Sequence, residues 1–101
     1  MITAIVLIQT DRGMSPDVAQ ELLGLSEVSE VYSVAGEYDL VAILRVREYG
    51  DMADAVPGKL QRLAGIGRTE TLMAFQCFSR HDLDRLFAIG VEEDVPAESD
   101  S

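Results

Sequence analysis

Two short polar stretches hold the residues whose types and spacing could bind a small molecule. The first, Gly36-Glu37-Tyr38-Asp39, lies between two apolar runs at 28–35 and 40–46 that are rich in β-branched residues. This pattern predicts a β-hairpin in which Gly36 adopts a backbone conformation that a Cβ atom would disfavour. The second stretch, 67–71, begins another predicted strand with Thr69, Glu70 and Thr71.

Together the two stretches carry the groups that a zwitterion needs. The hydroxyls of Thr69 and Thr71 and the N–H groups around Gly36 are donors for a carboxylate, and Asp39 is an acceptor for an ammonium group. These residues therefore predict a small polar metabolite bound between subunits, where ligand sites often lie. The simpler alternative is an ordinary solvated turn, because turns favour Gly and Asp for conformational reasons alone.

Other reactive side chains lack the neighbours that catalysis or metal binding requires. His81 is the only histidine and Cys77 the only cysteine, so neither has a second ligand of its type for a metal ion. Cys77 falls in an apolar strand pattern and is expected to be buried and unreactive. The chain has no GxSxG, P-loop or GxGxxG motif. We therefore expect no catalytic residues, no cofactor, no metal site and no enzymatic activity.

Composition predicts one ordered domain over residues 1–87 and an acidic disordered tail over 88–101. The 101-residue chain has a net charge of −10, and the tail carries five acids and no base. The eight basic residues are scattered along the chain, which argues against direct nucleic-acid binding. No run approaches the roughly 20 apolar residues of a membrane span, so we expect a soluble, cytoplasmic protein without membrane contact.

The elements that must position the polar stretches follow from periodicity and from turn residues. Residues 2–8 and 40–46 read as buried central strands, and 28–35 and 68–78 as less buried ones. Ser15 predicts an N-cap and Gly24 an end for a first helix of about nine residues. A second helix begins near Tyr49, and Pro57-Gly58 predicts a kink or break in it. A short capped helix is predicted at 79–87.

This β-α-β-β-α-β order predicts a ferredoxin-like α+β fold, with a four-stranded antiparallel sheet and two helices on one face. The first and third strands lie in the centre. The opposite face of the sheet is also apolar, so we expect a dimer that packs sheet against sheet. The two polar stretches adjoin the two edge strands, and we expect them to meet only across subunits.

The two motifs also carry a family resemblance. The run 34–41, followed by Leu63-Ala64-Gly65-Ile66-Gly67-Arg68-Thr69-Glu70-Thr71, resembles the C-terminal effector domain of the Lrp/AsnC (feast/famine) transcription regulators. That family shows a G-[EHY]-x-D turn and an L-x-G-[IV]-x-x-T-x-T start to the last strand. The similarity spans residues 1 to about 80. It does not account for Pro57-Gly58 or for the acidic tail.

The resemblance implies a homodimer that assembles further, into rings such as octamers, with an amino-acid effector between dimers. The candidate effector-binding residues carried over are Gly36, Tyr38, Asp39, Thr69, Glu70 and Thr71. We assign Asp39 to the ligand ammonium, and the Gly36 backbone with Thr69 or Thr71 to its carboxylate. The chain begins with a strand where the regulators carry a helix-turn-helix, so it resembles a stand-alone effector module that would influence transcription by co-assembling with full-length relatives.

Two other functions remain open from sequence. One is a small cofactor-independent enzyme of the dimeric α+β barrel type, such as a monooxygenase or isomerase. Such an enzyme would need a polar pocket between sheet and helices, for example one lined by Tyr32, Tyr49 or His81. The other is a scaffold that binds no ligand, which indifference to every metabolite would reveal.

Overall fold

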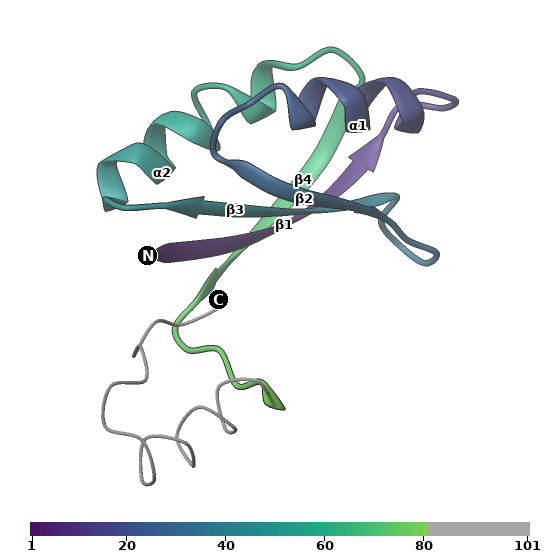
Figure 1. The fold of residues 1–101 in the computed structure, drawn as a ribbon. Coiled ribbons are helices and arrows are strands. Elements are labelled where there is room, and N and C mark those ends of the chain that lie inside the picture. The colour runs from purple at the N-terminus through teal and green to yellow at the C-terminus, as the bar shows by residue number, and fades with distance from the viewer. Residues whose placement is uncertain (81–101) are drawn as a thin grey trace, which may run out of the picture.

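The computed structural model describes residues 1–80 of the 101-residue chain. Its elements follow the predicted order, and Figure 1 shows the helices together on one side of the sheet: β1 (Ile2–Thr10), α1 (Ser15–Leu23), β2 (Val28–Ser33), β3 (Leu40–Val46), α2 (Tyr49–Ala55), the short 3-10 helix η1 (Leu60–Arg62) and β4 (Ile66–Ala74). Most of the predicted helix at 79–87 and all of the tail at 88–101 lie outside the described residues.

The sheet has the predicted ferredoxin-like topology. Its strand order is β2-β3-β1-β4, and every neighbouring pair is antiparallel. The two central strands are thus β1 and β3, the two with the most continuous apolar sequence. Each central strand has a neighbouring strand on both sides, which agrees with the apolar composition of β1 and β3.

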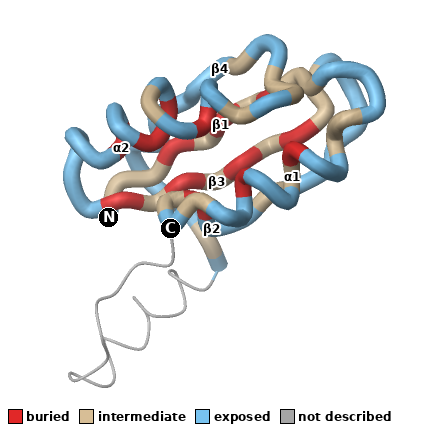
Figure 2. Tube along the Cα trace, turned by 90° about the horizontal axis from the view of Figure 1, so that it is seen from above, coloured by how far each residue is buried: buried red, intermediate tan, exposed pale blue. Residues whose placement is uncertain are grey.

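The core lies between the helices and one face of the sheet. Along β1 and β3 every second residue is buried, because successive strand side chains point to opposite faces. Figure 2 shows these buried positions, in red, running along the central strands beneath the helices. The buried residues of these two strands are Ala4, Val6, Ile8, Leu40, Ala42, Leu44 and Val46.

Helix α1 contributes Val18 and Leu22 to this core, four residues apart on one helical face. The predicted N-cap at Ser15 is wrong: Met14 is the N-cap, and no side chain caps the helix. The Ser15 hydroxyl instead makes a 2.6 Å hydrogen bond with the Thr10 hydroxyl. Ser15 therefore ties the helix start to the end of β1.

The predicted break in the second helix is confirmed. Helix α2 ends at Ala55, two residues before Pro57, and the chain resumes as η1 at Leu60. Proline lacks the N–H that would continue the helical hydrogen-bond pattern. Within the described residues, no helix has the length and apolar character needed to cross a lipid bilayer.

Two of the predicted strand ends and the burial of Cys77 are corrected by the structure. β2 ends at Ser33 and β4 at Ala74, earlier than predicted. The last pair of β4 joins Ala74 to Thr3, and β1 begins at Ile2, so a β4 that continued to residue 78 would run past its neighbouring strand. Cys77 lies beyond this end and is exposed, so the prediction of a buried thiol is wrong for the single chain.

Candidate functional site

The turn between β2 and β3 folds over the end of β1. Within it the Val34 N–H donates to the Asp39 carbonyl oxygen at 3.0 Å. The Asp39 N–H donates to the Ile8 carbonyl oxygen at 2.9 Å, and Gln9 Nε2 donates to the Glu37 carbonyl oxygen at 2.8 Å. These bonds hold the turn over the end of β1, so that it extends from the β2–β3 hairpin toward β4.

Tyr38 connects this turn to β4. Its hydroxyl donates to Glu70 Oε2 at 2.9 Å and accepts from Arg68 Nη2 at 2.8 Å. The Arg68 guanidinium also lies 5.4 Å from the centre of the Tyr38 ring and 3.8 Å from Glu37 Oε1. The hydrogen bond to Tyr38 raises the pKa of Arg68 above its usual value. We call Glu37, Tyr38, Arg68 and Glu70 the tyrosine cluster.

The tyrosine cluster corrects the expectation that the two polar stretches meet only across subunits. Only β1 separates β3 from β4 in the sheet, a distance of about 10 Å for two strand spacings. A turn that folds over the end of β1, together with a tyrosine and an arginine side chain, spans that distance. No local sequence signal indicates that the turn bends this way.

Asp39 has a structural role in the single chain. Its Oδ2 atom accepts from the Thr10 N–H at 2.9 Å and from the Thr10 hydroxyl at 3.3 Å. These bonds fix the end of β1 against the start of β3. Among the hydrogen bonds between described residues, Oδ1 of Asp39 takes part in none.

The three predicted residues of β4 do not share one face. Thr69 pairs with Ile8 and Thr71 with Val6, so both threonines are on the side of the helices. Glu70 pairs with Leu7 and is on the opposite side, where it meets Tyr38. The Thr69 hydroxyl accepts a hydrogen bond from Gln61 Nε2 at 3.2 Å. One chain therefore brings Tyr38 and Glu70 together but keeps the threonines apart from them.

The remaining predicted residue, Gly36, has the backbone conformation that was expected. Its φ is +138°, in the region that favours glycine, and a Cβ there would meet nothing within 4 Å. Arg68 and Gln9 were not among the residues predicted from sequence. The signal for Arg68 was available, since it precedes Glu70 by two residues and strand side chains repeat with that period.

The face of the sheet opposite the helices, which we call the open face, is apolar at its centre. Its central residues are less buried than those on the helix side, and Leu72 is 46% exposed. The register places these residues on it: Ile5, Leu7, Val41, Ile43 and Leu72.

A second polar group lies at the β2 edge of the open face. Glu30 accepts from the Tyr32 hydroxyl at 2.7 Å and from Arg45 Nη1 at 3.3 Å. The bond from Tyr32, and then that from Arg45, lowers the pKa of Glu30, and Glu30 raises the pKa of Tyr32. Polar side chains thus mark two edges of an apolar face.

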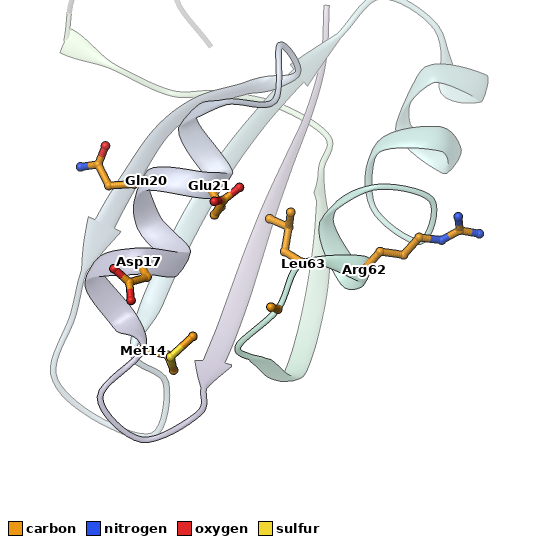
Figure 3. A pocket seen from close by; sticks show the side chains of 7 residues that line it. Met14, Asp17, Gln20, Glu21, Arg62 and Leu63 are labelled. Carbon is orange, nitrogen blue, oxygen red and sulfur yellow. The ribbon is translucent and has the colours of Figure 1, made fainter.

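A groove of about 510 Å³ lies on the helix side, between α1 and the segment that follows η1. Figure 3 shows that Arg62 points away from α1, while Leu63 points toward it. None of the six predicted effector-binding residues lines the groove, and neither do Tyr32 and Tyr49. The residues that line it are Met14, Asp17, Gln20, Glu21, Arg62, Leu63 and Ala64.

An enzyme of the α+β barrel type would need a polar pocket between the sheet and the helices. No polar or charged side chain of the described residues is buried between sheet and helices, and no group of three or more His, Cys, Asp or Glu among these residues could hold a metal ion. His81, the other candidate for such a pocket, lies outside the described residues.

Comparison with known sequences assigns the family. The profile of the Lrp/AsnC ligand binding domain matches residues 3–83, which is most of the chain. The chain belongs to the Lrp/AsnC family. The matched domain is a ligand binding domain, and the curated relatives are HTH-type transcriptional regulators.

Relatives of this Lrp/AsnC domain occur both as short chains and as parts of longer ones. The crystal structure of TTHA0845 from Thermus thermophilus is 41% identical, with a TM-score of 0.74, covering 79% of this chain and 100% of that one. An uncharacterized HTH-type transcriptional regulator of Pyrococcus horikoshii, PH1916, is 34% identical over 76 residues, 72% of this chain and 51% of the relative. The chain thus spans about half the length of the curated relatives it matches.

One solved relative carries an amino acid. The feast or famine regulatory protein Rv3291c of Mycobacterium tuberculosis, complexed with L-methionine, is 28% identical, with a TM-score of 0.66, covering 78% of this chain and 53% of that one.

Proposed function

We propose that this Lrp/AsnC domain binds an amino acid at an interface between copies of the chain, and that binding changes how the copies assemble. The observation that carries the proposal is the link between the 36–39 turn and β4 through the tyrosine cluster. The cluster holds the Arg68 guanidinium, the carboxylates of Glu37 and Glu70, and the Tyr38 hydroxyl at one end of the sheet. The L-methionine complex of the relative Rv3291c supports the choice of an amino acid.

The site requires residues from two copies. Asp39 Oδ1 would accept from the ligand ammonium while Oδ2 stays bonded to Thr10. The Gly36 backbone would donate to the ligand carboxylate together with Thr69 or Thr71 of another copy. Two copies are needed because both threonines are on the helix side of β4 in their own chain, away from Tyr38. Because residues of two chains complete the site, the ligand binds the assembled form more tightly than separated chains.

The same geometry gives the proposed route of regulation. A homodimer would pack sheet against sheet through the open face, because a contiguous apolar surface of this kind is seldom left in water. Dimers would assemble further, into octamer-like rings, through the ligand sites. Ligand binding would then shift the population of assemblies, and full-length Lrp/AsnC relatives that co-assemble with this domain would pass the change to transcription.

Thermal unfolding in the presence of each of the 20 amino acids at millimolar concentration tests this function. A ligand of micromolar affinity adds about 4 kcal/mol at a thousandfold excess, which raises the midpoint by many degrees. We expect one amino acid or a chemically related group to raise the midpoint, and the rest to leave it unchanged.

Two matched variants locate the site. Asp39→Asn should abolish the ligand-induced rise, whereas Asp17→Asn, which changes an exposed carboxylate on α1, should retain it. For each variant we compare the unfolding midpoint with and without ligand. A loss of stability caused by Asp39→Asn itself therefore does not affect the comparison. A flat response to all 20 amino acids would contradict the proposal and favour a scaffold.

A further inference from the structure

We propose that residues 75–80, which we call the arm, lie across the open face of a second copy of the chain, while the arm of that copy lies on the first. The inference rests on the proposed sheet-to-sheet dimer and adds to it the element that locks the two copies together.

The arm carries large apolar side chains that its own chain leaves in water. Phe75 is 97% exposed and Phe78 81% exposed, the two highest values among the exposed large hydrophobic residues. The last pair of β4 joins Ala74 to Thr3, and β1 begins one residue before Thr3, at Ile2. The arm therefore extends beyond the strand that its own sheet would offer as a partner.

The direction of the arm identifies where it can bind. Figure 1 shows residues 75–80 below the sheet, on the side away from the helices. This is the side of the open face, so a copy that covers the open face must meet the arm. Arg80 is helical, so the five residues before it can reach up to about 17 Å when extended. The outer strands of a four-stranded sheet are about 14 Å apart. The arm is thus long enough to cross the partner sheet.

The chemistry of the two surfaces matches. The open face offers aliphatic side chains at its centre, among them Ile5, Leu7 and Ile43, with no charged residue between them in the register. A Phe side chain buries about 150–250 Å², so two from each of two copies would bury roughly 600–1,000 Å². That is about half of a typical stable interface of roughly 1,600 Å². A two-fold axis makes the exchange reciprocal.

The arm carries its own reporter, because Cys77 lies between the two phenylalanines and is the only cysteine of the chain. The test measures how fast a thiol reagent such as DTNB modifies Cys77 in the full chain, alongside the oligomeric state by light scattering. We expect modification at least tenfold slower in the dimer than in a monomeric variant, Ile43→Glu. Equal rates in a proven dimer would overturn arm exchange and leave the dimer proposal intact.

Two further results separate the possibilities. If the wild-type chain is monomeric at every concentration, the dimer proposal and arm exchange both fail. If Cys77 stays protected in monomeric Ile43→Glu, the chain covers its own arm and arm exchange fails alone. Failure of arm exchange in a chain that still dimerises does not count against the amino-acid screen described above. A chain that stays monomeric would also contradict a ligand site built from two copies.

A pair of variants tests the arm without using the thiol. Phe75→Ser with Phe78→Ser should weaken dimerisation at least a hundredfold while the far-ultraviolet circular dichroism stays that of the folded chain. Tyr49→Ser is the matched control, because Tyr49 is also an exposed aromatic residue, 73% exposed, at the start of α2 on the helix side. An unchanged dimer dissociation constant in the double variant, or an equal loss in the control, would overturn the proposal.

Discussion

The two faces of the sheet are built from the same strands but differ in what covers them. On the helix side, Val6 and Leu44 are fully buried by α1, α2 and η1. On the open face, their sequence neighbours Ile5 and Ile43 are equally apolar but only partly buried. The strands themselves do not distinguish a core from an interface. Coverage by the helices decides which face stabilises the single chain and which is available to another copy.

The two faces also differ in their polar groups. On the helix side no polar or charged side chain of the described residues is buried. The open face has polar clusters at its edges, and Thr3 Oγ1 and Arg45 Nε are buried without a hydrogen-bond partner among the described residues. Buried polar atoms without partners cost free energy, and within the described residues both such atoms belong to the open face.

The largest expected effect compares neighbouring residues on the two faces. Leu44→Ala should lower the free energy of unfolding by about 2–5 kcal/mol, because it leaves a cavity in a fully buried position. Ile43→Ala, measured under conditions where the chain is monomeric, should cost clearly less, since its side chain is partly exposed. Urea unfolding followed by circular dichroism measures both. Equal losses would show that the open face is packed within the single chain.

Gly65 tests how tightly the helix side is packed. Its φ is +89°, and a Cβ would lie 2.8 Å from Val18 Cγ2 and 3.0 Å from Met14 Cε. Gly65→Ala should therefore destabilise the chain through both backbone strain and overlap with α1, by about 2–4 kcal/mol.

Gly13→Ala is the control for this variant. Gly13 also has a positive φ, +77°, but a Cβ there would meet nothing within 4 Å. Gly13→Ala should lower the free energy of unfolding only through backbone strain, by about 1–2 kcal/mol. If the two variants lose the same amount in urea unfolding, packing against α1 contributes nothing at Gly65.

Tyr38→Phe tests whether the polar groups at one edge of the open face bind the ligand. It removes the hydroxyl that joins Arg68 to Glu70 but leaves the ring in place. We expect affinity for the amino-acid effector to fall about tenfold, the worth of one hydrogen bond, with little change in the unfolding midpoint. Tyr32→Phe removes a hydroxyl from the other edge of the same face and should leave affinity unchanged. Titration calorimetry compares the two, and equal losses would argue against a site at the tyrosine cluster.

The smallest effect concerns a link on the helix side. Lys59 Nζ lies 2.7 Å from Glu27 Oε2, and this hydrogen bond lowers the pKa of Glu27 from its usual 4.5 and raises that of Lys59. A lowered folded-state pKa stabilises the fold above pH 4.5, and this stabilisation is lost as pH falls through the folded-state value.

Unfolding midpoints of the wild type and Glu27→Gln, measured from about pH 6 to about pH 3, test this link. The wild type should unfold at a slightly higher temperature at the upper end of this range, and the difference should shrink below pH 4.5. A difference that stays constant with pH would mean that the carboxylate charge of Glu27 does not contribute.

Sequence alone determined the architecture of this protein. Mostly apolar runs at 2–8 and 40–44 identified the central strands, and Pro57 identified the break after α2. These features depend on local preferences and on the two-residue period of a strand, both of which can be read along the chain. The two motifs likewise led to the Lrp/AsnC family, which the profile match over residues 3–83 confirmed.

Tertiary structure decided which polar residues meet. Alternation along β4 separates Thr69 and Thr71 from Glu70, and the fold of the 34–39 turn over β1 brings Tyr38 to Arg68 within one chain. The start of β1, not the apolar sequence of β4, sets where β4 stops and leaves Cys77 in water. Each outcome depends on where a neighbouring strand begins or how a turn bends in space, and local sequence preferences do not encode either.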